Sequence, residues 1–243
     1  MDLNQDENAL LEQIREARKN RETTPPRAEE LGVDIEGAYR VQVALGEGRE
    51  VIGYKLGLIK SEGQAQMGVD SPIYGRIYEG MILGSPVRLN SFLQPQLEPE
   101  LVVVLGESLP PGVSSGAAHA AIGGIYLGMD FLSNVWEGDS PVVADVVANN
   151  VAGGGFLLGE RLLNEPLEGN LRLYHNGHLL TEGRVGDIGN VEERLAWLSE
   201  AVGSLEAGQA IFLGTPAAPQ EATPGTVELH GPQGSVLVAS LQD

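Results

Sequence analysis

Two glutamates, Glu98 and Glu100, stand one residue apart at the start of an apolar run that covers residues 101–105. Side chains two residues apart in a β-strand point to the same face, so the two carboxylates are expected side by side. A run of Leu and Val of this kind is typical of a strand covered on both faces, which would carry the pair into the interior. The sequence therefore places two like charges in a low-dielectric environment.

Such a pair of carboxylates needs a partner. Two unit charges about 4 Å apart repel by roughly 4 kcal/mol at an effective dielectric constant of about 20. A shared proton, a basic side chain or a divalent cation would relieve this repulsion, and Mg²⁺, Mn²⁺ and Ca²⁺ all prefer carboxylate oxygen. In the simpler alternative, Glu98 lies at the solvated end of the strand and Glu100 pairs with an arginine. Spacing alone leaves these possibilities open.

Two further charged residues interrupt or end apolar strands. Lys55 lies within the run 51–58, which is otherwise Val, Ile, Leu, Tyr and Gly. It is either an outward-facing residue on an edge strand or a cation that lines a pocket, where it could hold an anion or transfer a proton. Asp130 closes the apolar run 125–129. It is either a turn or cap residue, or a third oxygen ligand beside the two glutamates.

The elements that would position these residues follow from hydrophobic periodicity and turn residues. Helical spacing predicts helices over residues 9–20, 34–45, 61–67 and 191–202, the second with Asp34 as its N-cap. After residue 86 the chain changes to short strands between Gly- and Pro-rich turns, which favours a mainly antiparallel β core. We expect an N-terminal helical or α+β region carrying the lysine at residues 1–83, and a β-rich catalytic domain at residues 84–243.

Composition narrows the class of protein. The 243 residues carry a formal charge of −19, which argues against a nucleic-acid partner and requires that any anionic substrate be held by local positive groups. The absence of cysteine excludes disulfides, thiolate metal sites and cysteine nucleophiles. No stretch approaches the ~18 apolar residues of a membrane helix, and the acidic first residues are unlike a secretory signal. We therefore expect a cytoplasmic protein that does not bind a membrane.

Several strings resemble a known family when they are taken in order. They are residues 53–58 (Gly-Tyr-Lys-Leu-Gly-Leu), residues 67–75, Glu98-Pro99-Glu100, residues 145–150 and residues 156–159. Together they resemble the 2-oxopent-4-enoate hydratase / 4-oxalocrotonate decarboxylase family of the fumarylacetoacetate hydrolase superfamily. The resemblance implies an α+β fold, a mixed β-roll with a smaller helical N-terminal part. It also implies a homo-oligomer, with a possible complex with a partner enzyme of the same pathway.

The resemblance also implies a set of site residues. Mg²⁺ (or Mn²⁺) would be held by carboxylates matching Glu98 and Glu100, and the active-site lysine would match Lys55. We assign Leu58 and Asn150, which lie in two of the matching strings, to substrate binding. The cation would chelate the 1-carboxylate and the 2-oxo oxygen of a small-molecule 2-oxo acid, and Lys55 would neutralise or protonate the developing charge.

Three positions depart from the family pattern. The family's third carboxylate aligns with Leu127, which cannot bind a metal, so Asp130 is expected to replace it unless water or substrate completes the shell. Ile73 and Ala152 stand where the hydratase branch has an acid and a serine. The expected function is a metal-dependent lyase for 2-oxo or 2-hydroxydienoic acids from aromatic meta-cleavage, foremost a 4-oxalocrotonate-type decarboxylase. Alternatives are a 2-oxopent-4-enoate-type hydratase, a catalytically reduced partner scaffold, or a hydrolase acting on acylpyruvates.

Overall fold

A large, mainly antiparallel sheet forms the centre of the molecule. The computed structural model describes residues 2–138, 141–162 and 168–243. In this part of the chain, seven strands pair in the order β2 (Ile73–Tyr78), β1 (Val51–Gly57), β9 (Ala210–Phe212), β4 (Gln96–Leu105), β5 (Ile122–Leu132) and β6 (Gly153–Arg161), with β10 (Gln220–Glu221) beside β4. Only β1 and β9 run parallel among these described neighbours.

A smaller sheet packs beside the large one. Within the described ranges its order is β3 (Val87–Arg88), β12 (Val236–Gln242), β11 (Gly225–His230), β7 (Asn170–His175) and β8 (His178–Arg184). The β7–β8 hairpin turns at Asn176 and Gly177, both with positive φ, as the Asn-Gly pair predicts. The predominance of antiparallel pairing and the mixture of helices and sheets confirm the predicted α+β class.

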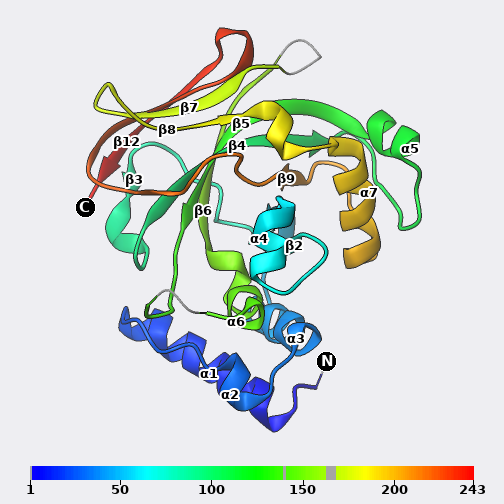
Figure 1. Ribbon diagram of the computed structural model, residues 1–243, viewed down its shortest axis with the longest axis vertical. Coiled ribbons are helices and arrows are strands. Elements are labelled where there is room, and N and C mark those ends of the chain that lie inside the picture. Colours follow the sequence, from blue (N-terminus) through cyan, green and yellow to red (C-terminus); the bar gives the residue numbers. More distant parts are fainter. Residues whose placement is uncertain (1, 139–140, 163–167) are drawn as a thin grey trace.

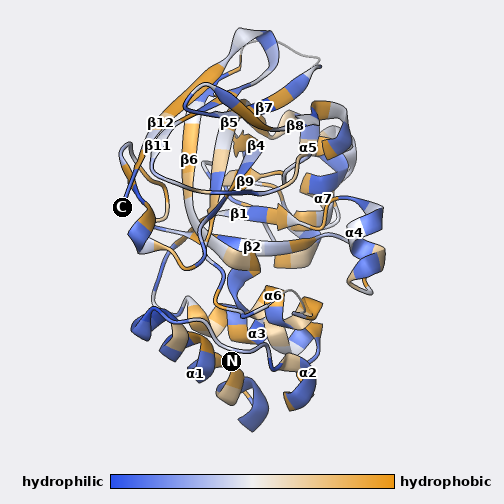
Figure 2. Cartoon of the chain, turned by 60° about the vertical axis from the view of Figure 1, so that its left-hand side comes forward, coloured by the Kyte–Doolittle hydropathy of each residue, from blue (hydrophilic) through white to orange (hydrophobic). Residues whose placement is uncertain are grey.

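A layer of helices covers one end of the large sheet. It contains α1 (Gln5–Asn20), α2 (Ala28–Leu31), α3 (Ile35–Leu45) and α6 (Val143–Ala148), which lie together below the sheet in Figure 1. Their apolar faces form a core of their own, visible as the orange segments turned toward one another in Figure 2. The remaining helices are α4 (Ser61–Gln66), α5 (Ser115–Ala120) and α7 (Val191–Val202), and the 3₁₀ segments are η1 (Leu89–Ser91), η2 (Asn150–Ala152), η3 (Val185–Ile188) and η4 (Pro232–Gly234).

Side-chain caps explain where the first helices begin. Helix α1 starts earlier than the apolar stripe predicts, because Asn4 and Glu7 form a reciprocal capping box ahead of it. Arg40 of α3 also pairs with Glu7, and this hydrogen bond holds the pKa of the Glu7 carboxyl below its usual value. Asp34 caps α3 as predicted, since its side chain accepts a hydrogen bond from the amide of Gly37. The N-terminal helices are thus joined to each other by charge as well as by apolar contact.

Lys55 lies in the large sheet together with the acidic residues, although its strand comes early in the chain. Strand β1 pairs with β2 on one side and with β9 on the other. The boundary predicted near residue 83 stays a prediction, and both strands that precede it belong to the sheet that contains β4 and β5. Among the described residues, no helix is both long enough and apolar enough to cross a membrane.

Candidate active site

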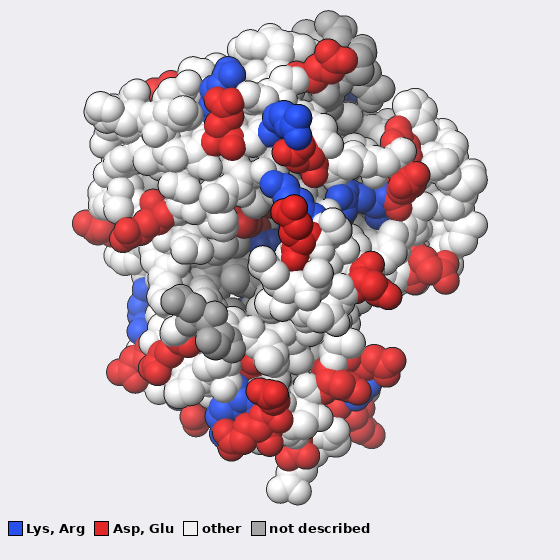
Figure 3. Space-filling view, in the orientation of Figure 1, with Lys and Arg blue, Asp and Glu red and all other residues white. Residues whose placement is uncertain are grey.

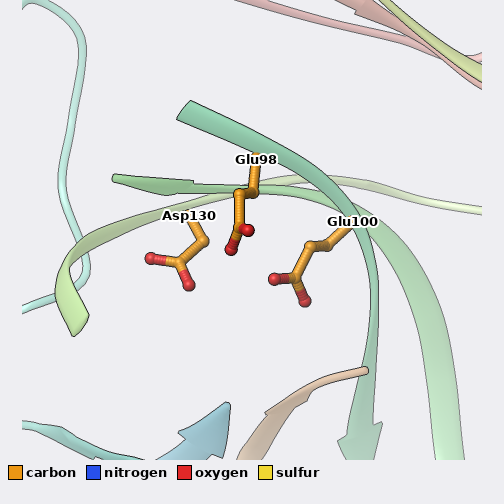
Figure 4. A group of neighbouring side chains, drawn as sticks. All are labelled: Glu98, Glu100 and Asp130. Atoms are coloured by element: carbon orange, nitrogen blue, oxygen red, sulfur yellow. The ribbon is translucent and has the colours of Figure 1, made fainter. Parts of the chain in front are cut away.

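The pairing of β4 with β5 brings three carboxylates together. Glu98 lies directly opposite Asp130 in the antiparallel register, and Glu100 lies opposite Gly128. One oxygen from each of the three side chains lies within 4.8 Å of the others, and Figure 4 shows all three pointing into the same space. Leu127 is three residues from Asp130 and therefore points to the opposite face, where it joins the apolar core. Asp130, and not Leu127, therefore lies beside the two glutamates, and its role as a third metal ligand stays a prediction.

The three carboxylates are largely shielded from solvent. Glu100 and Asp130 are 0% exposed, and the side chain of Glu98 retains 14% exposure. Burial raises the pKa of all three groups, that of Glu98 to about 7. The negative charges of Asp130 and Glu98 raise the pKa of Glu100 further. The alternative in which Glu98 is a solvated strand end and Glu100 pairs with an arginine is therefore wrong.

Lys55 is the basic partner of this group. Its Nζ lies 2.5 Å from Oδ2 of Asp130 and 3.9 Å from Oε2 of Glu98, and it donates a hydrogen bond of 2.9 Å to the carbonyl of Val151. The residue is 2% exposed on an interior strand, so the alternative of an outward-facing lysine on an edge strand is wrong. Burial lowers the pKa of Lys55, but Asp130 and the two glutamates outweigh it and raise the pKa above its usual value.

Charge and hydrogen bonding in this group are incomplete. With all three carboxylates ionised, the group and the ammonium of Lys55 would have a formal charge of −2 in a buried space, and the raised pKa values reflect how unfavourable that charge is without a cation. Gly214 donates its amide to Oε2 of Glu100 at 2.7 Å, whereas Oε1 of Glu100 and Oδ1 of Asp130 accept no hydrogen bond from any residue the structure describes. Buried oxygens without partners are costly, and carboxylate oxygens are the ligands that hard divalent cations prefer. The donor set and its charge fit a divalent cation.

A strained turn holds Lys55 from behind. Asn150, Val151 and Ala152 have φ values of 60°, 52° and 54°, a left-handed run that is uncommon for residues with side chains, above all for the β-branched Val151. The side chain of Asn150 secures the turn, because it accepts from the amide of Arg76 at 2.7 Å and donates to its carbonyl at 2.8 Å. The turn thereby directs the Val151 carbonyl at the lysine.

Gly75 provides the space for this arrangement. It lies opposite Lys55 on β2. A Cβ at Gly75 would lie 2.6 Å from the carbonyl oxygen of Asn150 and 3.1 Å from Cγ of Lys55. Only a residue without a side chain therefore allows the strand, the turn and the lysine stem to pack this closely.

A cavity of about 380 Å³ opens beside the carboxylates. Its lining includes Leu58, Lys60, Glu62, Glu98 and Thr215. Of the described lining residues, Lys60 is the one cation, and its Nζ donates to the carbonyl of Pro216 at 2.7 Å.

The two residues assigned to substrate binding lie in different surroundings. Leu58 lines this cavity in a left-handed conformation with a φ of 52°. Asn150 is 3% exposed, and its side-chain amide is occupied by the backbone of Arg76. The substrate-binding role of both residues stays a prediction.

Three contributors to the site were missed by the sequence reasoning. The Val151 carbonyl and the Gly214 amide are backbone groups, so no residue type marks them. Gly214 is 114 residues from Glu100 along the chain. Lys60 carried a usable signal, since it is a second lysine only five residues after Lys55.

Comparison with known proteins identifies the family. The sequence model of the Fumarylacetoacetate (FAA) hydrolase C-terminal family matches residues 72–241, which is well over half of the chain and includes all three carboxylates. The chain belongs to the fumarylacetoacetate hydrolase family. The match begins after Lys55, so the lysine comes to the site from outside the matched region.

Curated relatives of this family member extend the similarity toward the N-terminus. A 2-oxo-hept-4-ene-1,7-dioate hydratase of Escherichia coli is 29% identical over 217 residues, covering 79% of this chain and 81% of the relative. A 4-oxalocrotonate decarboxylase of a Pseudomonas species is 26% identical over 234 residues, covering 89% of this chain and 90% of the relative. The chain is thus similar to lyases of both kinds over most of its length.

A solved structure has the same fold as this family member. The 4-oxalocrotonate decarboxylase of Pseudomonas putida G7, complexed with magnesium and adipate, superposes with a TM-score of 0.87 at 23% identity and covers 96% of both chains. These comparisons confirm the predicted family, the predicted fold and the predicted class of enzyme, a lyase. Because hydratases and a decarboxylase both occur among the relatives, the choice between the two reactions depends on the site.

Proposed function

We propose that the protein is a divalent-metal-dependent carbon–carbon lyase that decarboxylates a 2-oxo-enedioate of the 4-oxalocrotonate type, with Mg²⁺ (or Mn²⁺) as its cofactor. The observation that carries this proposal is the buried group of three carboxylates with one lysine, which has a formal charge of −2 and two carboxylate oxygens without partners. A divalent cation would bring this group to zero net charge.

The residues that would hold the metal are Glu98, Glu100 and Asp130. When bound, the cation would supply Lewis acidity to the 1-carboxylate and 2-oxo oxygens of the substrate. The protein itself fixes the ligand positions, because all three side chains project from two paired strands and the Gly214 amide orients Glu100. The donors are all oxygen, which suits a hard divalent cation such as Mg²⁺ or Mn²⁺.

Lys55 is proposed as the catalytic charge partner. Its raised pKa keeps it protonated at neutral pH, and its hydrogen bond to Val151 fixes the ammonium beside the metal-ligand carboxylates. During decarboxylation the bond between the carbon chain and the far-end carboxylate breaks, its electron pair moves into the conjugated 2-oxo system, and that carboxylate leaves as CO₂. Lys55 would neutralise the negative charge that develops there and could return a proton to the product.

Lys60 supports an enedioate over a mono-acid. A 4-oxalocrotonate-type substrate carries a second carboxylate at its far end, and a protein of charge −19 needs a local cation to hold it. Lys60 lines the cavity next to Glu98 and is a suitable partner for that group. We assign Leu58, on the same wall, to contact with the carbon chain, and Asn150 to the wall behind Lys55.

The second candidate is the hydratase reaction. It is favoured by Glu62, a carboxylate that lines the same cavity on α4 and could activate a water molecule. Ile73, which stands where the hydratase branch has an acid, is 1% exposed and packs in the helical-layer core. That side chain supplies no polar group, which favours decarboxylation.

Turnover of two substrates separates these reactions. Purified protein with Mg²⁺ is incubated with 4-oxalocrotonate and with 2-hydroxypenta-2,4-dienoate, and both UV absorbance and CO₂ release are followed. The proposal predicts CO₂ release from the enedioate. Lys60→Met should lower kcat/KM for the enedioate about tenfold, as expected for loss of one charge-assisted contact. The matched control Lys19→Met, on an exposed turn of α1, should leave it unchanged. Hydration without CO₂ release would favour the second candidate, and no turnover of either substrate would refute both.

We further propose a cytoplasmic homo-oligomer. Val236 and Val238, 43% and 53% exposed on β12, and Leu179, 51% exposed on β8, leave apolar surface on the small sheet that a second copy could cover. A complex with a partner enzyme of the same pathway would use such a surface too. Sedimentation of the purified protein, alone and with the hydratase of its pathway, tests both proposals, and a lone monomer in each case would contradict them.

A further inference from the structure

A second cavity, on the other side of the turn that holds Lys55, is lined by three arginines. Arg18 and Arg21 come from the end of α1, and Arg49 follows α3. The cavity measures about 300 Å³ and also includes Ser91 and Ser133 in its lining. We call this cavity the arginine pocket. It shares no lining residue with the cavity beside the carboxylates.

The three arginines have no acidic partner in the described ranges, where no carboxylate oxygen lies within 4.0 Å of their side-chain nitrogens. Arg18 donates to Oδ1 of Asn149 at 2.9 Å and to its carbonyl at 3.3 Å. Arg49 lies over the ring of Tyr78, 4.6 Å from its centroid, and donates to a backbone carbonyl. All these partners are neutral, so the positive charges remain uncompensated.

This lack of partners is unexpected for this chain. The sequence has 34 acidic and 15 basic residues, and in Figure 3 acidic side chains cover more of the visible face than basic ones. In the part of the chain that the structure describes, five other arginines form ion pairs with a glutamate or an aspartate: Arg15, Arg27, Arg40, Arg172 and Arg184. Three arginines gathered around one hollow without a carboxylate therefore form a local positive site on a strongly negative protein.

Arg18 is the least solvated of the three. Arg18 is half-buried, and this burial, together with the weaker effect of repulsion from Arg49, lowers its pKa to about 10. The guanidinium therefore still carries its charge at neutral pH. A partly buried charge without a counter-charge is costly, and an anion in the pocket would remove that cost.

We propose that the arginine pocket binds a small oxyanion with at least two negative charges, a carboxylate or a phosphate. Guanidinium groups bind such oxyanions through paired, charge-assisted hydrogen bonds. The hydroxyl of Ser133, which already accepts from the amide of Leu93 at 3.0 Å, still has its proton to donate. The pocket thus offers donors on several sides and no carboxylate from its described lining to repel the anion.

The anion would lie against the support of the active-site lysine. Gly153 and Gly154, which line the arginine pocket, directly follow the strained turn. Asn149, which Arg18 binds, directly precedes it. Occupation of the pocket is therefore expected to slow the opening of this turn, whose Val151 carbonyl holds Lys55.

Calorimetric titration of the purified protein with inorganic phosphate and, separately, with succinate tests the proposal. Saturable binding of one or both anions is expected, and the arm that responds identifies the chemistry. A double variant, Arg21→Gln with Arg49→Gln, should weaken binding about tenfold or more, because each lost contact is charge-assisted. Arg88→Gln, which removes an exposed arginine elsewhere, is the matched control and should change binding less than about twofold. Phosphate should also slow amide exchange over residues 149–154.

Several outcomes would overturn the proposal. The first is the absence of saturable binding for both anions. The second is that the double variant and Arg88→Gln weaken anion binding equally, which would indicate a general charge effect. Succinate binding that persists in the double variant would place that anion elsewhere. If neither anion binds and the double variant changes the sedimentation of the protein, the arginines instead contact a second copy. None of these readouts uses turnover, so failure of the proposed lyase activity would be seen separately.

Discussion

Replacing Glu100 with glutamine separates charge repulsion from metal binding. The three carboxylates present oxygens within 4.8 Å of one another, and at this separation one ionised pair repels by ~3.5 kcal/mol at an effective dielectric constant of about 20. Glu100→Gln removes the charge but keeps the size and the acceptor oxygen for the Gly214 amide, and its new NH₂ group can donate toward Asp130. The metal-free variant should therefore be as stable as the wild type or more stable.

The metal should reverse this order of stability. With Mg²⁺ at a hundred times its dissociation constant, binding adds about 2.7 kcal/mol to the free energy of unfolding of the wild type. For a chain of this size that corresponds to a rise in Tm of about 5–10 °C. Glu100→Gln loses one of three charged ligands, so its Tm should rise by less than about 2 °C under the same conditions.

The assay is a thermal melt of chelator-treated protein with and without Mg²⁺. Glu107→Gln is the matched control, because Glu107 is exposed just beyond β4 and lies outside the carboxylate group. This control should keep the full Mg²⁺ response. The reasoning is refuted if Glu100→Gln keeps that response as well, or if the metal-free variant melts below the metal-free wild type.

The remaining predictions concern the same group of charges and its packing. In metal-free protein the pKa of Glu98 is about 7 in the folded state and 4.5 in the unfolded state, so between these pH values the folded protein keeps a proton that the unfolded chain has lost. The free energy of unfolding should therefore fall by about 3 kcal/mol as the pH rises from 4.5 to 7. Urea titrations at pH 5 and pH 8 measure this loss, which saturating Mg²⁺ should largely remove. Lys55→Met should lower kcat by about 100-fold or more, measured by turnover, and an unchanged kcat would exclude a catalytic role for Lys55. The same variant should destabilise the metal-free protein by about 3–5 kcal/mol, measured by urea unfolding. Gly75→Ala puts a Cβ 2.6 Å from the Asn150 carbonyl oxygen, so it should lower the free energy of unfolding by about 1–3 kcal/mol and reduce activity. A Cβ at Gly84 would have no atom within 4 Å, so the control Gly84→Ala should change neither quantity in the same assays.

Local sequence patterns predicted the elements and the glutamate pair. The two-residue spacing of Glu98 and Glu100, followed by an apolar run, contains the information that both side chains share one buried face. Helix α7 likewise begins and ends where the periodicity of residues 191–202 predicts. The glutamate pair and the helix bounds depend on residues that are close together in the sequence, so the sequence alone predicts them.

The parts of the site that depend on distant pairing were less accessible. Asp130 reaches the glutamates only because β4 and β5 pair in a register that sets it opposite Glu98, and a shift by one residue would have presented Met129 instead. The interior position of Lys55 depends on β9, a strand about 155 residues later, which covers β1 on its second side. The resemblance to a family pointed to Lys55 and left Asp130 as a candidate ligand, but neither it nor periodicity predicted these strand pairings.

The three left-handed residues behind Lys55 have a consequence for how this enzyme could evolve. Each such residue costs about 1–3 kcal/mol relative to a relaxed backbone. Glycine at Ala152 would avoid much of that cost, whereas glycine at the buried Val151 would also remove a side chain from the core. Laboratory selection for heat resistance alone should therefore favour glycine at Ala152. The selected proteins would unfold at higher temperatures but would hold Lys55 less firmly. Their thermal stability would therefore rise while their turnover fell within a few generations of selection.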